Sequence, residues 1–97
     1  MEYKNEKLGC SFEVPDKVTV RQQLRYFSAV GTEKDEPTFV QMWPGVGVLA
    51  ENWQCELLPD PKVSLDDITN PEQVRIVVWA GTTVFRHIDK LENVPNG

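Results

Sequence analysis

The strongest constraint on the fold is a long apolar repeat near the end of the chain. Apolar and small residues recur there at alternating intervals of three and four, the spacing of one helix face: Val74, Val77, Gly81, Val84, Ile88 and Leu91. Asn70 can cap this helix, Pro71 fits its first turn, and Glu72 suits the positive end of its dipole. The sequence therefore predicts a helix from about residue 71 to 93, before Pro95.

A second helix is predicted over residues 19–30. Thr19 is followed three residues later by Gln22, which is the pattern of a capping box, and Gly31 is a natural helix stop. Val20, Leu24 and Phe27 fall on one side of this helix. We expect that side to be buried.

A third helix is predicted over residues 37–53, because apolar residues again recur at helical intervals: Phe39, Trp43, Val46, Ala50 and Trp53. Pro44 lies inside this segment, where proline costs about 3 kcal/mol, and Gly45 and Gly47 follow it. The helix is therefore expected to be kinked or split. The two glycines would let another segment approach its backbone closely.

The remaining segments complete a fold that the sequence predicts to be mainly α. Residues 9–14 alternate as a short extended segment does, residues 1–7 are polar and expected to fray, and residues 54–69 form a proline-punctuated acidic loop. We expect residues 1–97 to form one small domain of three main helices. Its predicted core includes Leu24, Phe27, Trp53, Val77, Val84 and Ile88.

Charge and hydropathy argue against two classes of partner. The 15 acidic and 10 basic side chains give a formal charge of −5, which repels nucleic acid, and the basic residues are scattered. The longest weakly polar run, residues 76–85, is too short to cross a membrane, and the charged N-terminal segment is unlike a signal peptide. The sequence predicts a cytoplasmic protein without nucleic-acid or membrane partners.

No residue pattern indicates catalysis, a metal or a cofactor. His87 is the single histidine, which we expect at or near the surface, and no serine stands in a nucleophile motif. The acidic loop residues Asp60, Asp66 and Asp67 lack the spacing of an EF-hand, and residues 45–47 lack the pattern of a phosphate-binding loop. We therefore predict no catalytic residue, no metal site and no cofactor.

The two cysteines leave one question open. Cys10 and Cys55 are far apart and have no second pair, which is too few for a Cys-rich zinc site. Apolar neighbours such as Phe12 and Leu57 favour two buried, reduced thiols. A bond between Cys10 and Cys55 is the alternative.

Apolar surface is the remaining candidate for a function. Pro44 and the two glycines destabilise the second helix beside Trp43, and so small a domain has little stability to spare. We therefore predict that this helix presents an exposed Trp43 ring to a protein partner. The candidate partner-binding residues are Trp43, Pro44, Gly45, Val46 and Leu49. The competing interpretation is that these residues only pack tightly within the protein.

Three segments carry a resemblance to a known family: FEVPDKVTVRQQLRYFSA at 12–29, ENWQCELLPD at 51–60 and VVWAGTTVFRHIDKLENVP at 77–95. In their order of apolar, capping and turn residues they resemble the tail assembly chaperones of long-tailed phages. The resemblance implies a helical chaperone, able to form homo-oligomers, that acts in the host cell cytoplasm. Such a protein would coat the tape measure protein and hand it to tail tube subunits, and no catalytic residue is implied.

A small acidic phage or prophage inhibitor of a host defence protein is the alternative function. Its signature would be a dense carboxylate face, and the chain offers two acidic clusters, one at Glu33, Asp35 and Glu36 and one at Asp60, Asp66 and Asp67. A formal charge of −5 is weak for that role. A tape measure gene next to this one would favour the chaperone hypothesis, and a defence cluster would favour the inhibitor.

Overall fold

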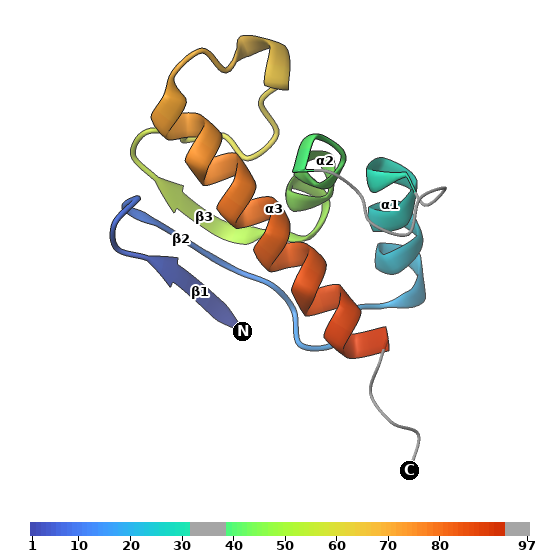
Figure 1. Cartoon of the computed structure of the whole chain (residues 1–97). Helices are drawn as coiled ribbons and strands as arrows, with labels where there is room; N and C mark the ends of the chain where they lie inside the picture. The colour runs from blue at the N-terminus through green and yellow to red at the C-terminus, as the bar shows by residue number, and fades with distance from the viewer. Residues whose placement is uncertain (32–38, 93–97) are drawn as a thin grey trace.

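The computed structural model describes residues 1–31 and 39–92, which form a three-stranded antiparallel sheet and three α-helices (Figure 1). The elements follow the order β1 (Glu2–Asn5), β2 (Cys10–Glu13), α1 (Val20–Val30), α2 (Phe39–Leu49), β3 (Glu51–Cys55), the short 3₁₀ helix η1 (Leu65–Asp67) and α3 (Pro71–Glu92). The fold is therefore α+β. The prediction of a mainly α domain with one short extended segment is wrong, because two further strands pair with the predicted one.

The first of these strands is β1, in the segment that was predicted to fray. β1 pairs with β2 as a hairpin, with Glu2 opposite Glu13 and Asn5 opposite Cys10, and Gly9 adopts a φ of 67° in the connection. Tyr3 packs its ring 5.7 Å from that of Phe12, measured between centroids. One aromatic side chain and the backbone pairing of β2 are enough to hold a strand whose other residues are polar.

The second is β3, which replaces the end of the helix predicted over residues 37–53. α2 runs through Pro44 as one helix but stops at Leu49, and Asn52 then takes a positive φ of 52°, which asparagine tolerates better than most residues. The register of β2 against β3 is irregular between Ser11 and Glu13. Trp53 thus lies on a strand, and its helical spacing from Trp43 is a coincidence.

The predicted starts of the other two helices are confirmed. The capping box of α1 is complete, since Gln22 N donates to Thr19 Oγ1 over 3.1 Å and Thr19 N donates to Gln22 Oε1 over 2.9 Å. Gly31 closes α1 with a φ of 81°. At α3, Glu72 N donates to Asn70 Oδ1 over 2.9 Å.

Glycines set the packing of α2 against its neighbours. α2 packs against both α1 and α3. A Cβ on Gly45 would lie 2.7 Å from Tyr26 Cδ1 and 2.7 Å from Val30 Cγ2 on α1. A Cβ on Gly81 of α3 would lie 3.1 Å from Met42 Cβ. The expectation that glycine beside Trp43 admits a neighbouring segment is confirmed, and that neighbour belongs to this chain.

Half of the six residues predicted to lie in the core are fully buried. Val77, Val84 and Ile88 are buried, whereas Phe27 and Trp53 are partly buried against the core. Leu24 was predicted to be buried but is 65% exposed. Because an α-helix turns by about 100° per residue, Leu24 and Tyr26 project to nearly opposite sides, and α1 turns Tyr26 and Val30 inward instead.

The sheet also joins the two cysteines. Cys10 on β2 lies directly opposite Cys55 on β3, their Cα atoms are 4.2 Å apart, and their sulfur atoms form a disulfide. The expectation of two reduced thiols is wrong. The reason is the missed strand β3, since without it nothing in the sequence brings residue 55 beside residue 10.

The glycines of α2 offer a matched test of this packing. We expect Gly45→Ala to lower the free energy of unfolding by about 1–3 kcal/mol, because the new methyl group has no room against α1. Gly47→Ala is the control, since its Cβ would meet Lys62 Cγ at 3.0 Å, in a flexible side chain, and it should stay within about 1 kcal/mol of the parent. Both gain the same helix propensity. Equal stabilities in urea denaturation would contradict the packing described here.

Candidate functional site

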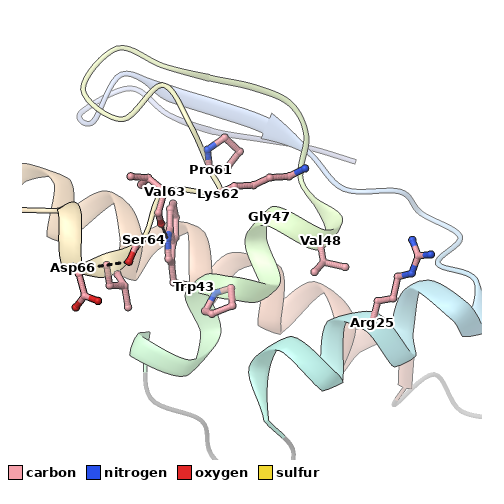
Figure 2. A pocket seen from close by; sticks show the side chains of 11 residues that line it. Arg25, Trp43, Gly47, Val48, Pro61, Lys62, Val63, Ser64 and Asp66 are labelled. Atoms are coloured by element: carbon pink, nitrogen blue, oxygen red, sulfur yellow. Dashed lines mark hydrogen bonds between the residues drawn. The ribbon is translucent and has the colours of Figure 1, made fainter.

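An open groove with a volume of about 820 Å³ runs between α1, α2 and the connection that precedes η1 (Figure 2). This volume is within the range of about 300–1,000 Å³ that is typical of ligand sites. The lining residues are Arg25 from α1, Trp43, Pro44, Gly47 and Val48 from α2, and Pro61, Lys62, Val63, Ser64, Leu65 and Asp66. The groove is therefore built by three segments that are distant in the sequence.

Two tryptophans anchor the connection between β3 and η1, which includes the outer wall of the groove, the segment 61–66. Trp43 Nε1 donates to the carbonyl oxygen of Val63 over 2.8 Å, and Trp53 Nε1 donates to that of Leu58 over 2.7 Å. A buried indole N–H requires an acceptor, and the carbonyls of an irregular segment require donors. Trp43 therefore ties residue 63 of the wall to α2, and Trp53 ties residue 58 of the same connection to β3.

Local turns complete the shape of this wall. Lys62 N donates to Asp60 Oδ1 over 2.9 Å, and Asp66 N donates to Ser64 Oγ over 3.2 Å, which caps η1. Proline and short polar residues favour such turns. The wall is thus an ordered part of the fold although its sequence has no regular period.

The floor of the groove is apolar and comes mainly from α2. Among its residues, Trp43 is buried, Val48 is partly buried and Pro44 is exposed. Gly47 has no side chain, which lets Pro61 and Lys62 of the outer wall approach the backbone of α2 closely. Pro44 and Gly47 both have a low helix propensity. In α2 they shape the floor of the groove.

The charged residues of the groove are separated along its length. Arg25 and the ammonium end of Lys62 lie on the side of α1, whereas Asp66 lies at the other end, beyond Trp43 (Figure 2). All three side chains are exposed. Among the side chains that the structure describes, those of residues 1–31 and 41–90, neither groove cation forms an ion pair with a carboxylate.

The predicted partner-binding residues divide into two groups. Trp43 and Pro44 line the groove, whereas Gly45, Val46 and Leu49 are buried elsewhere in α2. The expectation of an exposed Trp43 ring is wrong, because only 2% of this residue is accessible. It contributes to the groove as a support for its floor and wall.

Sequence reasoning missed the polar half of the groove. Arg25, Lys62 and Ser64 had no motif that marked them, and they line one groove because α1 packs on α2 and Trp43 bonds to residue 63. The turn residues around Pro61 were a signal for an ordered connection. They carried no signal for its position beside α1.

His87 was expected near the surface, and this is wrong. It is buried under β1, where Tyr3 Oη lies 2.6 Å from Nδ1 and the carbonyl oxygen of Pro15 lies 3.0 Å from Nε2. A carbonyl can only accept, so Nε2 donates to Pro15, and in the neutral ring Nδ1 then accepts from the Tyr3 hydroxyl. His87 therefore links α3 to the N-terminal hairpin and does not line the groove.

Two tyrosines have shifted pKa values, and neither lines the groove. Burial raises the pKa of Tyr3, with a smaller contribution from the charge of Asp16, and burial alone raises the pKa of Tyr26. A raised pKa means that the folded state favours the neutral phenol. Its contribution to stability is present below the unfolded pKa of about 10 and is lost as pH rises beyond it.

The described residues show no group of three or more His, Cys, Asp or Glu side chains that could hold a metal ion. No helix in the same part of the chain is long and apolar enough to span a membrane. Comparisons of the chain with protein-family models, with curated proteins and with solved structures find no match.

Proposed function

We propose that this protein acts by binding a segment of another polypeptide in the groove between α1, α2 and residues 61–66. The observation that carries the proposal is the groove itself, which joins an apolar floor to charged side chains at both ends. Apolar contact supplies affinity in such sites, and a few polar groups set the orientation of the ligand. An open groove with this lining suits an elongated ligand such as a peptide segment.

We propose that the role is non-catalytic. The hydroxyl of Ser64 accepts the backbone N–H of Asp66 in a helix cap, and neither a histidine nor a cysteine lines the groove. A nucleophilic mechanism needs a base within hydrogen-bond reach of the nucleophile. The groove residues supply contact and charge instead.

The specific form of the proposal is a tail assembly chaperone that binds the tape measure protein in the host cell cytoplasm. Its support is the resemblance of residues 12–29, 51–60 and 77–95 to that family. The resemblance implied a helical fold, whereas the fold is α+β. The physical basis for partner binding is therefore the groove. A chaperone of this kind would shield apolar segments of its partner, which the apolar floor suits.

The test is co-expression with the tape measure protein of the same genome, read as soluble yield and as co-purification. We expect the parent protein to raise the soluble yield, and Pro44→Gln to weaken the complex by about 1 kcal/mol, or fivefold in Kd, since part of the apolar floor becomes polar. Glutamine is neutral, so the effect does not report charge.

Val78→Gln is the matched control, because Val78 is also an exposed apolar helix residue but lies outside the groove lining. It should bind as the parent does. A tape measure protein that is equally insoluble with and without this chain would overturn the chaperone proposal. Equal losses from both variants would show that the groove is not the binding site.

A further inference from the structure

The two ends of the groove differ in charge, which restricts what can bind there. Arg25 and Lys62 reach the groove from α1 and from the outer wall, and both charged ends lie on the other side of Trp43 from Asp66 (Figure 2). Asp66 is the carboxylate of the lining and lies toward the opposite end. The groove is thus cationic beside α1 and anionic beside η1.

The two groove cations have no carboxylate within ion-pair distance among the described side chains. Neither Arg25 nor Lys62 takes part in the two ion pairs found there, and the carboxylate of Asp60 accepts the backbone N–H of Lys62. The whole chain has a formal charge of −5, so two cations beside one apolar floor run against its general charge. Charge complementarity across an interface favours the right partner and its orientation.

We infer that the groove takes a partner segment in which an apolar side chain has carboxylates on one side, and that these carboxylates lie at Arg25 and Lys62. This inference rests on the proposed function and adds the chemistry and direction of the bound segment. The apolar side chain lies over Pro44 and Val48, while the carboxylates meet the guanidinium and ammonium groups. Asp66 disfavours an acidic residue at the other end, which fixes the direction.

The probe is a pair of synthetic peptides of equal length with the same apolar residues, one with glutamates and one with lysines at the polar positions. Binding is measured by fluorescence anisotropy of the labelled peptide at low ionic strength. We expect the glutamate peptide to bind the parent about five- to tenfold more tightly than the lysine peptide, since two exposed charge pairs are formed. The preference should shrink at about 0.15 M salt.

A charge reversal separates local from general electrostatics. The double variant Arg25→Glu with Lys62→Glu should prefer the lysine peptide, whereas Arg21→Glu with Lys7→Glu should keep the parent preference. The control changes the net charge equally, and its residues are also exposed, one on α1 and one in a loop, but outside the lining. Arg25→Gln with Lys62→Gln, which removes the charges without reversing them, should abolish the preference.

Each outcome bears on the inference. Equal binding of the two peptides to the parent would overturn the inference and leave polypeptide binding in the groove standing, whereas binding of neither peptide would count against both. An equal loss of preference in the control variant would also overturn it, since the preference would then report net charge. Circular dichroism of each variant verifies that these surface substitutions leave the fold intact.

Discussion

Trp43→Ala should lower the free energy of unfolding by about 3–5 kcal/mol, the range for truncating a buried tryptophan. The residue is 2% exposed, its ring centroid lies 6.1 Å from that of Trp53, and its Nε1 holds the carbonyl of Val63. The substitution removes core contacts and releases the outer wall of the groove. Chemical denaturation monitored by circular dichroism measures the loss.

Trp43→Phe separates the contribution of the core contacts from that of the hydrogen bond to Val63. It retains most of the apolar ring but leaves the carbonyl of Val63 without its indole donor, which should cost about 1–3 kcal/mol. Val78→Ala, at a position that is 37% exposed, should change stability by less than about 0.5 kcal/mol. A loss below about 1 kcal/mol for Trp43→Ala would return Trp43 to the surface role that the sequence suggested.

The second large effect is expected from the disulfide. Breaking the bond between Cys10 and Cys55 should lower the free energy of unfolding by about 2–4 kcal/mol, because it closes a loop with a sequence separation of 45 residues. For a domain of this size, that loss should lower Tm by roughly 10 °C or more. Thermal unfolding with and without a reductant measures it.

The variant Cys10→Ala with Cys55→Ala is the control for the reductant. It should melt near the reduced parent and should not respond to reductant. If the parent is also insensitive and its two thiols react with an alkylating reagent under denaturing conditions, the cysteines are not bonded. The strands β2 and β3 would then be held by backbone pairing and the aromatic cluster alone.

This disulfide bears on the proposed chaperone role. Cytoplasmic proteins are mostly kept reduced, whereas a disulfide persists in oxidising compartments. A chaperone that acts in the host cytoplasm would therefore have to fold with the bond open. The reduced parent can fold in that compartment only if its Tm lies above 37 °C.

Local signals in the sequence were sufficient for the helix starts. Thr19 with Gln22, and Asn70 with Pro71, act within one turn of chain, so their geometry follows from neighbours in the sequence. The buried positions Val77, Val84 and Ile88 follow from a repeat that runs along most of α3. These features depend on no distant contact.

The sheet could not be predicted in the same way, because its two missed strands depend on long-range pairing. β1 is polar apart from Tyr3, and β3 follows α2 so closely that Trp53 continued a helical spacing by chance. The choice of face on α1 failed for a related reason. Leu24 and Tyr26 are both credible core residues, and only the position of α2 selects Tyr26.

The sequence predicted part of the groove lining. Pro44 and the glycines beside it indicated a binding site on α2, and Trp43 and Pro44 do line the groove. Arg25 and Lys62 reach it only through the packing of α1 and the bond from Trp43 to Val63. Their charge pattern is a tertiary property, which a search for local motifs does not detect.

The most direct test of partner binding in the groove is a nuclear magnetic resonance titration of the isotope-labelled protein with a soluble fragment of the tape measure protein. We expect amide shift changes at the groove-lining residues that carry a backbone N–H, which are Arg25, Trp43, Gly47, Val48 and residues 62–66. The amides of the hairpin of β1 and β2 and those around Val74 and Val78 should change little. A spectrum that does not change, or changes centred on the hairpin or on Val74 and Val78, would contradict the account.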